Sequence, residues 1–212
     1  MERTQGIVIR TADYREKDRL CVIFTPKGAV TVTAKGVRSP TAKLKTAAMT
    51  MAFGEFIYGG KNGKAILSGA EIADNFFDAW RDKMKVAAIM TCFELAEKCF
   101  DKDGETATEF IELLKTINET VYGQCNPLCT AFKYAVFCAE RTGTDYSEIR
   151  EYDEISYGII KAFSICETED VGTMPYTEFG VTRAFGFLVN LISNYLGIKI
   201  YSFGTLIKQN DG

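Results

Sequence analysis

The sequence predicts an α+β protein in two parts, a five-stranded β-barrel of the OB-fold size followed by an all-helical domain. Five short runs rich in β-branched and aromatic residues fill residues 6–70 without a helical pattern between them. From Phe76 onward, apolar residues recur at steps of three and four. Charge changes sign nearby: of 25 Lys+Arg and 28 Asp+Glu, residues 1–64 hold 12 and 5, a net +7, and the remainder carries −10. We expect domains at residues 1–75 and 76–212.

The five strands are expected at residues 6–10, 20–24, 29–34, 53–58 and 65–70. Pro26-Lys27-Gly28 is a turn signal between the second and third strands. Asn62-Gly63 tolerates the positive φ angles of a type I′ turn, so the last two strands are expected to form a hairpin. Five short strands with these turns favour a small barrel.

The first helix is expected to run for about six turns, with one apolar face formed by Trp80, Met84, Ala87, Ala88, Thr91, Leu95 and Cys99. A second is expected over residues 106–121, and a third from Asn126-Pro127 to about Gly143, because Asn is a good N-cap and Pro suits the first turn. Weaker helical patterns cover residues 156–166 and 178–196, and residues 198–207 are expected to be irregular or a short helix.

The composition is that of a folded protein, with 47% hydrophobic and 25% charged residues. We find neither a signal-peptide pattern at the start nor a stretch of about 18 apolar residues free of charge, so we expect a cytoplasmic protein with no membrane segment. The seven cysteines are an odd number scattered over strand-like and helix-like segments, which favours reduced, mostly buried thiols over a disulfide scaffold.

The sequence contains no histidine, which excludes Ser-His and Cys-His nucleophiles. We therefore expect a protein that is not an enzyme. The glycine-rich residues 59–64 are not a phosphate-binding P-loop, because Ala65 stands where that motif needs Ser or Thr.

We expect no metal and no cofactor. Cys125 and Cys129, with Cys138 and Cys166, are four thiols without any Cys-x-x-Cys spacing, and on a helix positions 125 and 129 would share a buried face. The carboxylates of the helical part are dispersed at surface spacing, which favours a solvated face over a metal or acid/base pair.

The segment 35–45 is the strongest functional feature, because it follows a strand and has four cations, a glycine, hydroxyl groups and no carboxylate. Such a loop places cations and backbone amides against phosphates. Four further cations are expected to extend the surface, although Asp13, Glu16 and Asp18 interleave with them. The predicted DNA-binding residues are Lys35, Arg38, Lys43, Lys45, Arg10, Arg15, Lys17 and Arg19.

Four aromatic residues of the first domain are candidates for stacking on bases, and strand alternation directs about half of such residues into the core. These candidates are Tyr14, Phe53, Phe56 and Tyr58.

Two parts of the sequence resemble a known family. Residues 6–20 (GIVIRTADYREKDRL), 24–28 (FTPKG) and 34–38 (AKGVR) resemble the N-terminal domain of the bacterial recombination mediator family RecO, and residues 195–206 (YLGIKIYSFGTL) resemble its C-terminal signature. The resemblance implies an OB-fold followed by a helical domain. It also implies a non-catalytic protein of DNA repair that binds single- and double-stranded DNA, anneals strands and helps to load the RecA recombinase.

The partners that the resemblance implies are RecR and the C-terminal tail of the single-strand-binding protein, with RecA served indirectly. An acidic tail needs a local basic pocket, for which Arg81, Lys83, Lys133, Arg141 and Arg183 are candidates beside exposed apolar residues. Many members of the family carry a four-cysteine zinc module after the third helix. Residues 144–156 contain no cysteine here, so the sequence resembles a variant without that module.

Two alternatives stay open from the residues alone. In the first, the barrel and the helical domain bind only other proteins, and the basic loop is merely solvated. In the second, which has weaker support, dispersed carboxylates bind a metal ion that cleaves nucleic acid. Salt-sensitive binding of an oligonucleotide distinguishes the first alternative from DNA binding, and metal-dependent cleavage tests the second.

Overall fold

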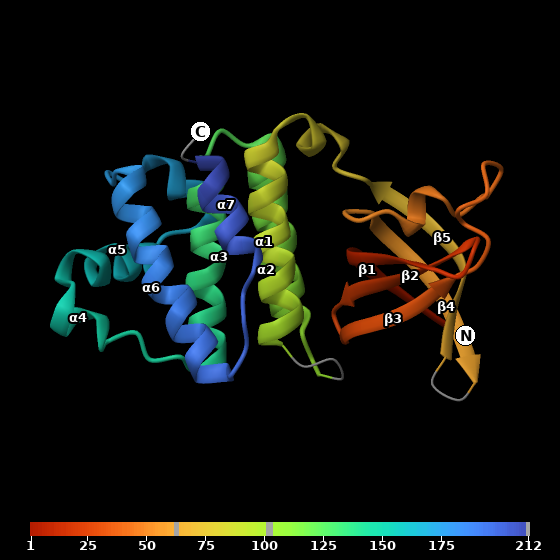
Figure 1. Ribbon diagram of the computed structural model, residues 1–212, viewed down its shortest axis with the longest axis horizontal. Coiled ribbons are helices and arrows are strands. Elements are labelled where there is room, and N and C mark those ends of the chain that lie inside the picture. The colour runs from red at the N-terminus through yellow and green to blue at the C-terminus, as the bar shows by residue number, and fades with distance from the viewer. Residues whose placement is uncertain (62–63, 101–103, 211–212) are drawn as a thin grey trace. The chain divides into compact units, whose positions relative to one another are not determined.

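The computed structural model describes residues 1–61, 64–100 and 104–210 and divides them into two compact units. Unit 1 contains Met1–Phe77 and Phe100–Ile111, and unit 2 contains Asp78–Cys99 and Glu112–Gly212. Strands form the first unit and helices form most of the second (Figure 1). The predicted α+β class, an OB-like barrel followed by a helical region, is confirmed.

The five strands are β1 (Glu2–Tyr14), β2 (Asp18–Thr25), β3 (Gly28–Ala34), β4 (Phe53–Lys61) and β5 (Lys64–Asp74). They close into a barrel in the order β1-β2-β3-β5-β4, in which only the β3–β5 pair is parallel. All five predicted strands are present, and each is longer than predicted. Lys61 pairs with Lys64, so β4 and β5 form the expected hairpin, while the predicted turn Asn62-Gly63 lies outside the described residues.

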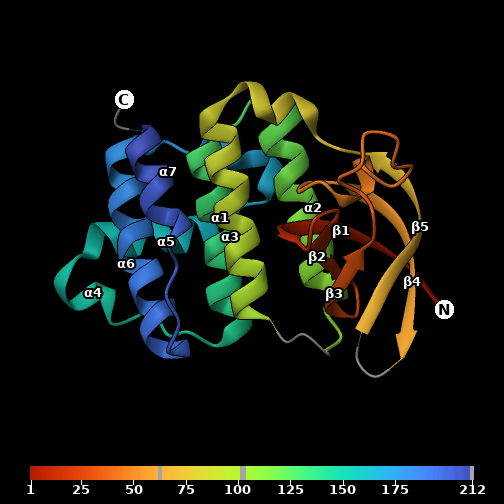
Figure 2. The same cartoon turned by 45° about the vertical axis from the view of Figure 1, so that its right-hand side comes forward.

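The barrel core is filled by alternate apolar residues of all five strands, including Val8, Ile23, Val32, Phe56 and Leu67. After β3 the chain leaves the barrel as a loop, orange in Figures 1 and 2, and a short 3-10 helix (Thr46–Ala48) precedes its return to β4. This loop contains the predicted DNA-binding segment 35–45.

Unit 1 takes in a second piece of chain, Phe100–Ile111. The Thr106 hydroxyl accepts from Gly28 N at 2.8 Å and donates to the Thr25 carbonyl at 2.8 Å, while Thr106 N donates to the Pro26 carbonyl at 3.0 Å. The Phe110 ring lies 6.4 Å from the Phe24 ring. One threonine thus satisfies three backbone groups of the β2–β3 turn, far from it in sequence.

Unit 2 is built from α1 (Lys83–Cys99), the larger part of α2 (Ala107–Tyr122), and α3 (Pro127–Thr142), α4 (Ile149–Tyr152), α5 (Glu154–Ile165), α6 (Glu178–Leu196) and α7 (Ser202–Asn210). Helix α3 lies at its centre and contacts α1, α5 and α6. The Phe132 ring lies 4.8 Å from Phe163 and 5.3 Å from Phe185. This aromatic cluster joins three helices into one core.

Helix boundaries follow local capping. The Asn126 side chain accepts from Leu128 N at the start of α3, and Gly143 and Gly197 end α3 and α6 in the left-handed conformation. The expected first helix needs a correction: α1 begins at Lys83 because the Asp82 carboxylate accepts from Met84 N and Lys85 N. Trp80 therefore precedes α1, in a 3-10 helix, and is 49% exposed.

Two further expectations are refined. The tail forms the short helix α7, and residues 144–156 form a connection followed by α4 and the first residues of α5. Cys125 precedes α3 while Cys129 lies within it, so the two cysteines do not share a helix face, contrary to expectation.

Among the described helices, none is both long enough and apolar enough to cross a membrane.

Candidate nucleic-acid interface

The loop between β3 and β4 has a defined conformation. Val37, Ala47 and Ala48 are buried among the core residues of the barrel. Met51 N donates to the Val8 carbonyl at 2.8 Å, and Val8 N donates to the Ala52 carbonyl at 2.9 Å. The loop is therefore attached to the barrel at both its middle and its end, which fixes the backbone that carries the lysines.

One carboxylate holds two of the predicted DNA-binding arginines. Asp13, on β1, accepts from Arg19 Nη2 at 3.2 Å through Oδ1 and forms an ion pair with Arg38, whose Nη2 lies 3.2 Å from Asp13 Oδ2. Arg19 Nη1 also donates to the Ala48 carbonyl at 3.2 Å. Arg19 and Arg38 thus position the loop, because their guanidinium groups bind a carboxylate and backbone carbonyls of the protein itself.

The loop is also joined to the β1–β2 turn. Arg38 Nη1 donates to the Glu16 carbonyl at 3.0 Å, and Arg38 N donates to the Lys17 carbonyl at 3.1 Å. Gly36 N donates to Asp18 Oδ1 at 2.9 Å, and the φ of +66° at Gly36 is one that glycine adopts without strain. These bonds bring the two basic segments predicted from the sequence, 10–19 and 35–45, to one place.

Five of the eight predicted cations remain exposed without an ion pair to any residue that the structure describes. They are Arg15, Lys17, Lys35, Lys43 and Lys45. Arg15 stacks over the Tyr14 ring with 5.1 Å between its guanidinium carbon and the centroid. Arg10 is exposed on β1. A cluster of unneutralised cations on a fixed backbone is the arrangement that binds phosphates.

Of the four stacking candidates, Tyr14 alone is classed as exposed, at 38%. Phe56 is fully buried and Tyr58 is 7% exposed, and burial raises the pKa of the Tyr58 phenol to about 12. Phe53 is half-buried, and its ring lies 6.4 Å from Phe110. This surface therefore combines several exposed cations with one exposed aromatic residue, Tyr14.

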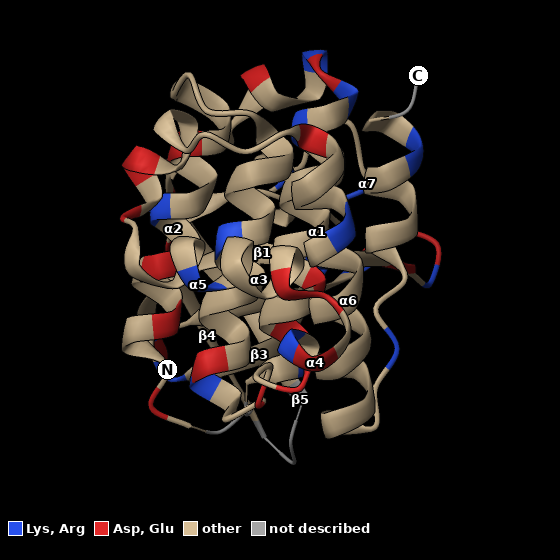
Figure 3. Ribbon diagram, turned by 90° about the vertical axis from the view of Figure 1, so that its left-hand side faces the viewer, with Lys and Arg blue, Asp and Glu red and all other residues tan. Residues whose placement is uncertain are grey.

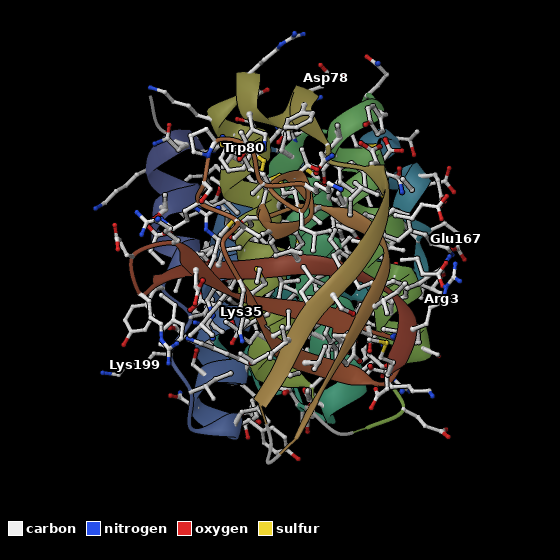
Figure 4. The ribbon with its side chains drawn as sticks, turned by 90° about the vertical axis from the view of Figure 1, so that its right-hand side faces the viewer. Arg3, Lys35, Asp78, Trp80, Glu167 and Lys199 are labelled. Carbon is white, nitrogen blue, oxygen red and sulfur yellow. The ribbon has the colours of Figure 1, made fainter. Side chains whose placement is uncertain are left out.

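A groove of about 760 Å³ on the same unit was missed by the sequence reasoning. Its lining includes Arg3, Lys27, three threonines and the backbone of Gly59 and Gly60. Arg3 is paired with Glu55, while Lys27 is exposed in the β2–β3 turn. Arg3 lies well apart from Lys35 (Figure 4). Residues of all five strands form this groove, so no single segment of the sequence carries a signal for it.

Unit 2 contains an apolar cavity of about 520 Å³ between the start of α1 and helix α7. Its lining residues are Trp80, Lys83, Val86, Ala87, Met90, Ser202, Thr205 and Gln209. Of the five cations expected at a partner-tail pocket, Lys83 lines this cavity. The others lie elsewhere: Arg81 pairs with Asp78 at 3.2 Å, Arg183 pairs with Asp153 at 2.6 Å, Lys133 is buried and Arg141 is near the end of α3.

Helix α7, one wall of this cavity, is held by Glu94 of α1. Glu94 Oε2 accepts from Tyr201 N at 2.9 Å and Ser202 N at 2.7 Å, and Oε1 pairs with Lys98 at 2.6 Å. Burial raises the pKa of Glu94, but the hydrogen bonds from Lys98, Ser202 and Tyr201 outweigh it, so the pKa lies below its ordinary value. The carboxylate stabilises the N-terminus of α7.

The cysteines behave as core residues. Four are buried and three are half-buried, and all seven are free thiols. Burial raises the pKa of the Cys21 thiol to about 11, which makes it unreactive near neutral pH. Within residues 1–61, 64–100 and 104–210, no three Cys, Asp or Glu side chains gather in a way that would hold a metal ion.

The fold and this surface define a class of protein, one in which an OB-like barrel with a basic loop precedes a helical region. Residues 1–76 match the family model described as "Recombination protein O N terminal". The chain is 28% identical over 123 residues to "DNA repair protein RecO" of Listeria monocytogenes serotype 4b (strain CLIP80459), covering 56% of this chain and 48% of that protein. The protein of the same name from Shouchella clausii (strain KSM-K16) is 27% identical over 125 residues, covering 58% and 49%.

These matches show that the chain is similar to RecO proteins, and the similarity to the family model lies in residues 1–76, where most of its motifs were found. The chain spans about half the length of the curated relatives it matches. The matched family domain coincides with the barrel and its basic loop.

Proposed function

We propose that this protein is a DNA-binding recombination mediator that acts in DNA repair by binding and not by catalysis. In this proposal, residues 1–75 bind single- and double-stranded DNA and residues 76–212 dock partner proteins. One observation carries this proposal. Arg19 and Arg38 form ion pairs with Asp13 and position the loop, while the three lysines of the loop remain exposed. The similarity of residues 1–76 to the RecO N-terminal family model, and of the chain to curated RecO proteins, supports the same role.

The geometry suits strand annealing. Lysines bind phosphates as point charges and read no bases, so a strand on this loop keeps its base edges accessible to a complementary strand. Tyr14, with Arg15 stacked over it, supplies one aromatic surface beside the cations. Both strands of a duplex and single strands present the phosphates that such a surface needs.

The test is oligonucleotide binding by a variant with Lys35→Ala, Lys43→Ala and Lys45→Ala. If each lysine meets one phosphate, the slope of log K against log salt for single strands falls by about 2, since each contact contributes about 0.7. The matched control carries Lys115→Ala, Lys199→Ala and Lys208→Ala, three exposed lysines of unit 2. It should keep the original slope.

An unchanged slope in the loop variant would remove the loop from the interface. A third variant, Lys27→Ala, then shows whether the groove beside the β2–β3 turn binds the strand instead. If none of the three variants nor the original chain binds DNA with salt sensitivity at micromolar protein, the protein is a protein-interaction module. Annealing of DNA coated with the cognate single-strand-binding protein tests the mediator role directly.

For the helical domain, we place the acidic C-terminal tail of the single-strand-binding protein in the cavity beside Trp80. The cavity offers apolar residues and the exposed ammonium of Lys83. Trp80 is the single tryptophan of the sequence, so its emission should shift when a synthetic tail peptide binds. Lys83→Glu should weaken that binding about tenfold or more by replacing attraction with repulsion. A titration in which emission does not change would exclude this cavity.

A RecR-type protein is the second proposed partner, and RecA would be served indirectly through the DNA that the complex prepares. Copurification of RecR with the full chain tests the first of these partners. Loading of RecA on precoated DNA tests the second. Variants of the loop should impair loading while copurification remains, because the two activities are assigned to different surfaces.

A further inference from the structure

Helix α5 carries an apolar row that faces solvent. Ile155 is 77% exposed and Ile165 is 83% exposed, and Gly158 and Ala162 lie between them. The spacing i, i+3, i+7 and i+10 places all four on one side of the helix. The opposite side is already used, because Ile159, Ile160 and Phe163 are buried in the core of unit 2.

Helix α6 extends this surface. A Cβ at Gly180 would lie 3.1 Å from Ile159 Cδ1, so α6 approaches α5 closely at this glycine. The neighbouring residue, Phe179, is 75% exposed. A Cβ at Gly158 would meet nothing within 4 Å, so the helix surface between Ile155 and Ile165 is open to solvent. We call Ile155, Gly158, Ala162, Ile165 and Phe179 the α5–α6 apolar surface.

Carboxylates border this surface. Glu154 precedes Ile155, Glu167 follows Ile165 by two residues, and Glu178 precedes Phe179, and all three are exposed. Figure 3 shows further acidic segments, in red, around α4. An exposed apolar surface of this kind marks an interaction site when polar residues surround it.

The cations near the surface are engaged within the protein. Arg183 pairs with Asp153 at 2.6 Å, and the Lys161 ammonium lies 5.9 Å from the centre of the Tyr146 ring. Neither neutralises Glu154, Glu167 or Glu178 through an ion pair within the described part of the chain. The surface therefore presents apolar residues within a negative border.

We propose that the α5–α6 apolar surface binds a partner protein through an amphipathic helix with aliphatic residues on one side and Lys or Arg beside them. Aliphatic side chains fit the apolar row on α5, and Gly158 lets a partner helix approach closely, as in other complexes of an amphipathic helix with an apolar surface. The flanking cations of such a helix meet Glu154, Glu167 and Glu178. DNA and acidic tails are repelled by the same carboxylates, so this site is distinct from the two in the proposed function and does not depend on it.

The probe is a fluorescein-labelled 18-residue helical peptide of leucine and lysine, and its control has glutamate in place of every lysine. Anisotropy with the full chain should show at least tenfold tighter binding of the lysine peptide. A variant with Ile155→Ser, Ile165→Ser and Phe179→Ser should lose that binding by tenfold or more. The matched control, Phe77→Ser, Ile111→Ser and Tyr195→Ser, removes three exposed large side chains elsewhere and should bind as the original chain does.

A third variant, Glu154→Gln, Glu167→Gln and Glu178→Gln, should reduce the preference for lysine while the fold, checked by circular dichroism, is unchanged. Equal binding of both peptides, or equal losses in the α5–α6 and control variants, would overturn the proposal. It is also overturned if sedimentation shows a dimer that the α5–α6 variant dissociates, because a second copy would then cover this surface. DNA affinity should be the same in all these variants, which separates this result from a failure of the proposed function.

Discussion

The barrel and the helical unit use their charged side chains in opposite ways. In the barrel, Asp13 forms ion pairs with Arg19 and Arg38, and the neighbouring lysines stay exposed. In unit 2 two lysines form internal hydrogen bonds instead: Lys85 donates to the Val121 carbonyl at 2.7 Å, and Lys133 donates to the Phe163 carbonyl at 2.9 Å.

The sign of each surface therefore depends on which charges are used in internal bonds as well as on composition. A net charge of +7 or −10 predicts the sign of a surface only broadly. The hydrogen bonds decide which individual side chains are left to meet a partner. Four substitutions compare the two units further, two through their packing and two through their internal charge contacts, from the largest expected effect to the smallest.

The largest effect is expected where β4 and β5 approach most closely. A Cβ at Gly54 would lie 2.2 Å from the Glu71 carbonyl oxygen, which is backbone and cannot turn aside. Gly54→Ala should lower the free energy of unfolding of the barrel by about 3 kcal/mol or more, measured by urea denaturation. Gly69→Ala, whose new Cβ would lie 3.4 Å from Ile57 Cδ1, is the matched control and should cost less than about 1 kcal/mol. Equal costs would contradict this packing of β4 on β5.

The second test concerns Glu94, whose carboxylate accepts hydrogen bonds at the start of α7. Glu94→Ala should destabilise unit 2 by about 2–3 kcal/mol, since charged hydrogen bonds to Ser202, Tyr201 and Lys98 are lost. Amide exchange in α7 should accelerate most.

The effect of Glu94 should depend on pH. Because its folded pKa is lowered, its contribution is fully present above the unfolded value of about 4.3 and is lost as pH falls through the folded pKa. The stability difference between the original chain and Glu94→Gln should therefore be constant above about pH 5 and shrink below about pH 4. A difference that grows on acidification would contradict the assignment.

The third test removes the carboxylate that holds the basic loop. Asp13→Asn should cost about 1 kcal/mol, because exposed ion pairs contribute little individually. Amide exchange in residues 36–48 should accelerate, whereas Asp78→Asn, which removes another exposed pair with an arginine, should leave that segment unchanged. Unchanged exchange after Asp13→Asn would show that the core contacts of Val37 and Ala48 alone hold the loop.

The smallest effect is expected on α5, and it is stabilising. Gly158→Ala should raise stability by about 0.5–1 kcal/mol, because the new methyl group meets nothing and alanine favours the helix. Gly180→Ala on α6 is the matched control, since its Cβ would lie 3.1 Å from Ile159 Cδ1. It should gain less or lose stability in a thermal melt. Equal gains would contradict the close approach of α5 and α6.

The sequence could predict features with local causes. Asn126 and Pro127 begin a helix and Gly143 ends it through capping within a few residues, and β-branched runs mark the five strands. Strand lengths were underestimated because β1 includes polar residues such as Glu2 and Asp13, whose side chains face solvent while the backbone stays paired.

The remaining features arise from residues far apart in the sequence. No local pattern shows that Asp13 lies between Arg19 and Arg38, that Trp80 lines a cavity with α7, or that Glu94 holds Ser202. The charge cluster at 35–45 was visible in the sequence, but which cations are engaged and which are exposed depends on these distant contacts. Sequence therefore located the candidate surface without assigning roles within it.

Thr106 and Phe110 belong to the barrel unit, but they are synthesised after helix α1 of unit 2. Thr106 forms hydrogen bonds with the β2–β3 turn, and Phe110 packs on Phe24. Both residues are synthesised after residues 1–77, so the strands leave the ribosome before these contacts can form. A nascent chain of that length holds an incomplete barrel with unpaired turn amides. The barrel is therefore expected to be complete only after the first helix of the following unit has been translated.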